Sequence, residues 1–187
     1  MSIKDYVAEI EIQGTTPILF HAWSIEETEK KSAAKKGSSE KKDPSLESLV
    51  YRNAEGDICI PGDYFRAALI DTGRYFPDPR SPRKSSKDLF KQCIIMETML
   101  APIGPGVKKT WDEVDKRRVV IQKAAITRQR PRFKEGWTAK FQLRIILPEY
   151  ISIEYLQEIA EKTGLINGLA DFRPTYGRFT VTSCQKI

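Results

Sequence analysis

The sequence has few of the residues that build disulfide frameworks and metal sites. Its 187 residues include three cysteines, Cys59, Cys93 and Cys184, and one histidine, His21. The cysteines are odd in number, far apart and without a CxxC pair, so we expect reduced thiols. A single histidine makes a zinc site improbable, and we expect neither a metal nor a cofactor.

Long apolar runs are also missing. No stretch is long enough to cross a bilayer, and the first residues lack the basic start and apolar core of a secretory leader. We therefore expect a soluble, cytoplasmic protein with no membrane contact. Hydrophobic residues make up 40% of the chain, which suits a single domain over residues 1–187.

Positive charge is in excess, with a net charge of +6, and this favours an anionic partner. Residues 24–46 are rich in Lys, Glu, Ser and Ala and are not apolar enough to form a core, which predicts a flexible insertion. Residues 128–134 are densely basic with few carboxylates, so they are the better candidates for phosphate contact. The alternative is a basic surface strand without a partner.

The order of periodic segments predicts an α+β chain. Its expected form is a ferredoxin-like (RRM-like) βαββαβ-type sheet with helices on one face, long basic insertions and an open face free for a ligand. Residues 89–100 are apolar, but their periodicity does not distinguish helix from strand. The predicted strands are 6–20 (interrupted at 14–17), 49–52, 57–60, 117–127, 137–147 and 178–184. The predicted helices are 63–73 and 152–164, and residues 75–87 are predicted to be an exposed loop.

The segment 164–181 combines small, charged and aromatic residues at a helix-to-strand turn. Gly168 and Gly177 would let the backbone approach a ligand, while Phe172 and Tyr176 offer faces on which a base could stack. Such a segment is typical of a nucleic-acid-binding loop. The alternative is an ordinary connection in which Gly164 and Gly168 end the helix.

Three features together resemble the RAMP superfamily of CRISPR systems, and within it the backbone subunits that coat guide RNA. They are a first strand from Tyr6, an Ile-Pro-Gly start of a helix carrying Arg66, and the Gly168…Gly177-Arg178-Phe179 segment before the last strand. The resemblance implies that residues 102–136 form a basic, thumb-like hairpin that separates bases of the bound strand. It also implies a protomer that multimerises along single-stranded RNA with other effector subunits.

The chain is also similar to small phage-encoded proteins of unassigned role. The shared features are the Thr-Pro-Ile-Leu start at residues 16–19, the Lys-rich insertion and the Gly…Arg-Pro…Gly-Arg-Phe ending. This similarity implies a phage recombination or defence-related role. A single-stranded DNA-binding or annealing protein is therefore one alternative.

Two more functions are compatible with the sequence. The RAMP resemblance implies a metal-independent endoribonuclease as one alternative, for which His21, Asp171, Glu26 and Glu27 are the candidates. The other is an assembly protein with acidic partners. No second histidine or carboxylate pair supports acid–base chemistry, so we expect binding without catalysis, with RNA favoured over DNA. The expected nucleic-acid-binding residues are Arg66, Lys123, Arg128, Arg130, Arg132, Phe133, Lys134, Gly168, Phe172, Arg173, Tyr176, Gly177 and Arg178.

Overall fold

The structure is a computed structural model that describes residues 5–22, 45–121 and 124–187. These residues form several antiparallel sheets and three α-helices, which confirms the predicted α+β class. Most of the expected flexible insertion at 24–46, including Glu26 and Glu27, lies outside the described residues, and so does Lys123.

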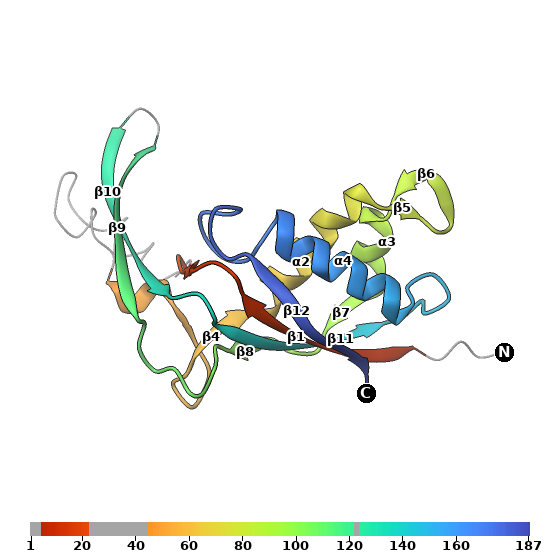
Figure 1. The fold of residues 1–187 in the computed structure, drawn as a ribbon, viewed down its shortest axis with the longest axis horizontal. Helices are drawn as coiled ribbons and strands as arrows, with labels where there is room; N and C mark the ends of the chain where they lie inside the picture. The colour runs from red at the N-terminus through yellow and green to blue at the C-terminus, as the bar shows by residue number, and fades with distance from the viewer. Residues whose placement is uncertain (1–4, 23–44, 122–123) are drawn as a thin grey trace, which may run out of the picture.

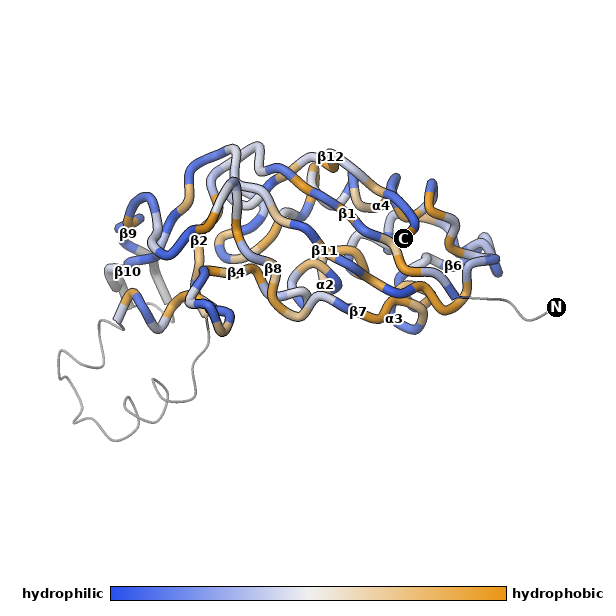
Figure 2. The backbone as a smooth tube through the Cα atoms, turned by 90° about the horizontal axis from the view of Figure 1, so that it is seen from below, coloured by the Kyte–Doolittle hydropathy of each residue, from blue (hydrophilic) through white to orange (hydrophobic). Residues whose placement is uncertain are grey.

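A four-stranded antiparallel sheet forms the centre of the molecule. Its strands lie in the order β12, β1, β11, β7, so the first of them in the chain pairs with the last and with the third. Buried hydrophobic residues alternate with polar ones along β1 and β11, as predicted, and the tube in Figure 2 shows this alternation. The strands are β1 (Tyr6–Gly14), β7 (Ile94–Met96), β11 (Thr138–Ile145) and β12 (Phe179–Lys186).

Three helices lie on one side of this sheet (Figure 1). Between β1 and β7 the chain forms α2 (Gly62–Thr72) and α3 (Lys87–Cys93), and between β11 and β12 it forms α4 (Ile153–Ile166). The two predicted helices are confirmed to within two residues. The undetermined segment 89–100 contains the end of α3, then β7 and the start of β8.

The ends of α4 show which sequence signals were correct. Ser152 caps its start, because its hydroxyl accepts a hydrogen bond from the backbone N–H of Tyr155 at 3.2 Å. Gly164 was expected to end the helix, but α4 continues past it to Ile166. It lies inside α4 against the backbone of Phe179, where a side chain would collide with the carbonyl oxygen. The chain turns at Gly168, which has a φ of 67°.

The core fills the space between the helices and the sheet. Phe65 of α2 stacks on Phe141 of β11, with ring centroids 4.5 Å apart and an interplanar angle of 11°. Ile10, Leu143 and Leu156 are fully buried around this pair. The hydrophobic positions of β1, β11, α2 and α4 therefore meet in one core, and their burial is the main stabilising term of the fold.

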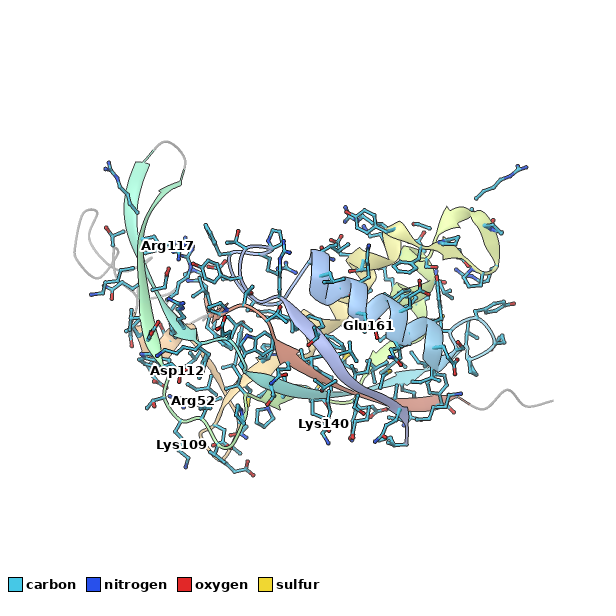
Figure 3. The ribbon with its side chains drawn as sticks, in the orientation of Figure 1. Arg52, Lys109, Asp112, Arg117, Lys140 and Glu161 are labelled. Atoms are coloured by element: carbon cyan, nitrogen blue, oxygen red, sulfur yellow. The ribbon has the colours of Figure 1, made fainter. Side chains whose placement is uncertain are left out.

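The opposite face of the sheet is polar, and its charges are paired. Lys140 lies on this face, away from the helices (Figure 3), and its Nζ is 3.2 Å from Glu9 and 2.6 Å from Glu11. The Arg144 guanidinium pairs with Asp5 and Glu97 at 2.7 Å each. This face was expected to be free to carry a ligand. Carboxylates that neutralise its cations make it a poor surface for a polyanion.

Three smaller sheets complete the fold, and two of them differ from expectation. The predicted strand 6–20 divides at its turn, and β2 (Ile18–Leu19) leaves the central sheet to pair with β10 (Ala124–Phe133) and, through it, β9 (Glu113–Ile121). The predicted loop 75–87 contains the exposed hairpin β5 (Pro77–Asp78) and β6 (Ser81–Ser85). The predicted hairpin at 49–60 is confirmed. It consists of β3 (Tyr51–Arg52) and β4 (Ile58–Pro61), and β8 (Leu100–Pro102) pairs with β4 as the third strand of that sheet. Two short 3-10 helices remain, η2 (Leu46–Leu49) before β3 and η3 (Gly73–Tyr75) after α2.

None of the described helices is both long enough and apolar enough to span a membrane.

Candidate nucleic-acid interface

The hairpin β9–β10 extends from one end of the molecule (Figure 1) and carries most of its excess charge. Between residues 113 and 133 there are seven Lys and Arg residues against two carboxylates. The antiparallel register places Arg132 opposite Glu113, Arg130 opposite Asp115, and Arg128 opposite Arg117. Directly opposite residues share a face, so these six side chains form one ladder in which only the last pair has like charges.

The second part of the site is the segment 167–178, called the C-terminal loop here, which connects α4 to β12. It lies between the hairpin and the helices (Figure 1). Arg130 forms an ion pair with Asp171, and Arg117 donates a hydrogen bond to the hydroxyl of Tyr176. The structure therefore brings together two basic segments that are more than forty positions apart in the sequence.

Arg117, which lies on the hairpin (Figure 3), connects the two segments. Its guanidinium lies 5.3 Å from the ring centroid of Phe172 and 4.8 Å from that of Tyr176, within the range of cation–π contacts. Two hydrogen bonds to Oδ2 of Asp115, at 2.7 and 2.9 Å, help to fix it. These bonds raise the pKa of Arg117 further above its already high ordinary value. Arg117 therefore stays charged while it holds the two rings in place.

Arg130 is the second residue that holds the loop against the hairpin, and it is 3% exposed. Its guanidinium lies 5.7 Å from the ring centroid of Phe172, within the range of cation–π contacts. Its Nη1 has no hydrogen-bond partner among the described residues, so Asp171 provides most of the compensation for this buried charge. Arg130 therefore supports the loop and is not free to contact a phosphate, contrary to expectation.

The backbone of the C-terminal loop is held in an unusual conformation. Ala170 and Phe172 have positive φ values, 63° and 59°, in a region that side chains with a Cβ rarely adopt. Such residues cost of order 1–3 kcal/mol and persist where their surroundings fix them, often at binding sites. They place Asp171 between them, toward the hairpin, and leave Phe172 41% exposed.

Gly168 and Gly177 have another role than expected. They lie where the two ends of the loop cross, and the N–H of Leu169 donates to the carbonyl of Gly177 at 2.8 Å. A Cβ on Gly177 would collide with the backbone of Leu169, and Gly177 itself is buried. These glycines close the loop, so their backbones do not present a surface to a ligand.

Three more of the predicted contact residues are engaged within the fold. Arg66 donates to the carbonyl oxygens of Ile94 at 2.9 Å and Lys91 at 2.7 Å, which ties α2 to the α3–β7 connection. Phe133 is 1% exposed and packs edge-on against Phe20, so it cannot stack on a base. Arg132 lies 3.2 Å from Glu113.

The remaining predicted residues lie on or beside the surface made by the hairpin and the loop. Lys134 is exposed and 3.3 Å from Glu113. Arg128, Arg173 and Arg178 form no ion pair with any described residue, although Nε of Arg178 donates to the carbonyl of Pro174 at 2.8 Å. Arg173 and Arg178 are exposed and Arg128 is half-buried. We call these three arginines and the Phe172 side chain the free arginine surface. Arg128 lies on the hairpin and the others on the C-terminal loop, and these two segments contact each other through Arg117 and Arg130.

Cavities lie next to this surface. One, of about 240 Å³, is lined by His21, Tyr64, Ala67, Ala170, Asp171 and Arg173. The pKa of Tyr64 is raised by burial and by its hydrogen bond with Tyr51, so its hydroxyl is neutral at pH 7. His21 and Asp171, two of the catalytic candidates, thus line one cavity. No cluster of three or more metal-ligating residues occurs in the part of the chain that the structure describes.

Sequence reasoning missed Arg117 and Tyr64. The spacing Asp115-x-Arg117 on a strand is a weak signal for an ion pair on one face, because residues two apart share a side of the sheet. Tyr64 carried no signal, since the segment that it faces is more than a hundred positions away.

Comparisons with known proteins show similarity in structure and not in sequence. No protein-family model matches the chain, and no curated protein matches it. A chain in the cryo-EM structure of the type III-B Cmr-beta bound to cognate target RNA matches with a TM-score of 0.56 at 10% sequence identity. The match covers 100% of this chain and 62% of that one. This chain therefore shares its fold with part of a larger chain from that complex.

Proposed function

We propose that the chain is a non-catalytic, single-stranded RNA-binding protomer of the RAMP type, built on a ferredoxin-like unit. The strand order β12, β1, β11, β7 supports the ferredoxin-like description, because the fourth, first, third and second strands of the unit are then neighbours, with helices following the first and third. The shared fold with a chain from an RNA-bound complex supports the RAMP description.

The observation that carries the proposal is the contact between the hairpin and the C-terminal loop. Arg117 and Arg130 hold this contact together, and the arginines of the free arginine surface have no carboxylate partner among the described residues. Such a surface attracts a phosphate backbone, and the exposed Phe172 ring offers a face for a base. The contacts are mainly to phosphates, so binding depends on charge more than on sequence.

The proposal includes assembly. The resemblance to backbone subunits supports copies that line up along one strand in the cytoplasm, together with other effector subunits. In that arrangement the hairpin β9–β10 is the thumb that separates bases. The mass of the protein–RNA complex should then grow in steps as the RNA is lengthened, which size-exclusion chromatography with light scattering would measure.

The test of RNA binding is a salt titration. Fluorescence anisotropy with a labelled single-stranded RNA should give a log–log slope of about −0.7 for each phosphate contacted. An unlabelled competitor series of RNA and of DNA with the same bases, deoxyuridine included, separates this proposal from a single-stranded DNA-binding protein, because only the 2′-hydroxyl differs. No binding at low salt would contradict the proposal and favour an assembly protein.

A second candidate function, a metal-independent endoribonuclease, has one observation in its favour. His21 and Asp171 line the same cavity, where an acid and a base would have to meet. Asp171 is engaged by Arg130, however, and therefore has a structural role already. Incubation of labelled RNA with the protein in a chelator tests this candidate. Cleavage that disappears in His21→Ala would establish it against our proposal.

A further inference from the structure

The cavity beside Asp171 has a size that suits a small planar group. Tyr64 and Ala67 lie one helical turn apart on α2, and His21 and Ala170 complete the walls. The two alanines leave room that larger side chains would fill. A volume of about 240 Å³ lies below the range of about 300–1,000 Å³ that is typical of drug-sized ligands. A single nucleobase, with at most eleven heavy atoms, is a suitable occupant.

The acceptor in this cavity is held firmly. The Asp171 carboxylate is anchored through Oδ2, which accepts a hydrogen bond from Nε of Arg130. The backbone N–H of Asp171 donates to the carbonyl of Leu19 at 3.0 Å. Ala170 and Phe172, on either side of Asp171, have positive φ values, and such a conformation persists where the surrounding structure holds it. Oδ1 accepts no hydrogen bond within the described ranges 5–22, 45–121 and 124–187. Each carboxylate oxygen can accept two hydrogen bonds, so acceptor capacity remains on both.

A route for the rest of the nucleotide continues from this cavity. A second cavity, of about 420 Å³, shares Ala170, Asp171 and Arg173 with the first and extends to Asn167 and Phe172. Arg173 is exposed and lines both cavities, so it can pair with the phosphate of a nucleotide whose base enters the first. The Phe172 ring lies beside this path, where a neighbouring base can stack.

We propose that the first cavity receives one unstacked base of the bound RNA and that Asp171 selects a base with adjacent N–H donors, guanine above all. This inference rests on the proposed RNA-binding function. Guanine offers the N1–H and the N2 amino group side by side, which match the two oxygens of a carboxylate. Cytosine and adenine offer only an amino group on the same edge. Uracil places carbonyl oxygens on both sides of its single N–H, and these repel a carboxylate.

The test uses the full chain and RNA changed at one position. A 20-nucleotide oligouridine is compared with the same RNA carrying one central guanosine or one central inosine, which keeps N1–H but lacks the amino group. The guanosine RNA should bind about fivefold tighter or more than the oligouridine, since a bidentate base contact gives about 1–3 kcal/mol of discrimination. Inosine should lose most of that gain.

A variant pair then assigns the preference to Asp171. Asp171→Asn replaces an acceptor oxygen with a donor, so the guanosine preference should disappear. Asp63→Asn removes the same charge from an exposed position on α2 outside the cavity, and the preference should persist. Should Asp171→Asn not fold, the comparison of guanosine with inosine on the unchanged protein still decides.

The possible failures are distinct. Equal affinity of the unchanged protein for the oligouridine and guanosine RNAs would overturn the base pocket and leave the proposed function intact. Persistence of the preference in folded Asp171→Asn would overturn the role of Asp171. Absence of binding to every RNA would overturn the proposed function and the pocket with it.

Discussion

Replacing Arg128, Arg173 and Arg178 together with alanine should weaken RNA binding and flatten its salt dependence without unfolding the protein. None of the three forms an ion pair with a described residue, so their removal leaves no carboxylate uncompensated. Arg173 and Arg178 are exposed and Arg128 is half-buried, so little packing is lost. The expected change in unfolding free energy is within about 1 kcal/mol.

The size of the binding effect follows from the number of contacts. Three lost phosphate contacts should reduce the log–log salt slope by about 2, at about 0.7 for each charge on a single strand. Between 50 and 200 mM salt, the ratio of unchanged to variant affinity should then shrink roughly twentyfold. Fluorescence anisotropy at four or five salt concentrations measures both quantities, and circular dichroism checks the fold.

The matched control is the triple replacement of Arg83, Lys84 and Lys162 with alanine. These residues are exposed, lie on β6 and α4, and carry the same total charge. The control should keep the slope of the unchanged protein. Equal slopes for the two triple variants would refute the reasoning, because the effect would then come from net charge and not from a defined surface.

Three further predictions test the loop, the contact of α4 with β12 and the half-buried thiol of Cys184. Phe172→Ala should weaken the binding free energy for RNA by about 1–3 kcal/mol, because a stacked base is lost. Tyr150 is a similarly exposed aromatic residue far from the loop, so Tyr150→Ala should leave the affinity unchanged. Equal effects of the two substitutions would contradict the stacking role. Gly164→Ala should destabilise the protein by about 1–3 kcal/mol in a urea titration, because the new methyl group meets the backbone of Phe179, although helix propensity alone favours alanine. Burial raises the pKa of Cys184 to about 11. Only about 0.1% of this thiol is then ionised at pH 8, so its alkylation, followed by mass spectrometry, should rise about tenfold per pH unit and not level off near pH 9.

Regular elements could be predicted from the sequence because their signals are local. The alternation along β11 and the Ser152 cap of α4 depend on residues close together in the chain, and both are confirmed. Gly164 shows the limit of such signals. A glycine that ends a helix and a glycine that admits a neighbouring strand look alike until β12 is in place.

The roles of the arginines could be predicted only in part. The alternation of Arg128, Arg130 and Arg132 places them on one face of β10, but their partners decide what they do. Arg130 pairs with Asp171 and Arg132 with Glu113, while Arg128 faces another arginine. A carboxylate 41 positions away leaves no trace in the local pattern, so the three residues look equivalent in the sequence.

The most direct measurement of the shared surface is photocrosslinking of a bound RNA that carries 4-thiouridine, followed by mass spectrometry of the crosslinked peptides. If the hairpin and the C-terminal loop bind one strand together, crosslinks should appear in residues 113–133 and in residues 167–178 of the same complexes. Crosslinks confined to the polar face of the sheet, on β1 and β11, or to the β5–β6 hairpin would contradict this proposal.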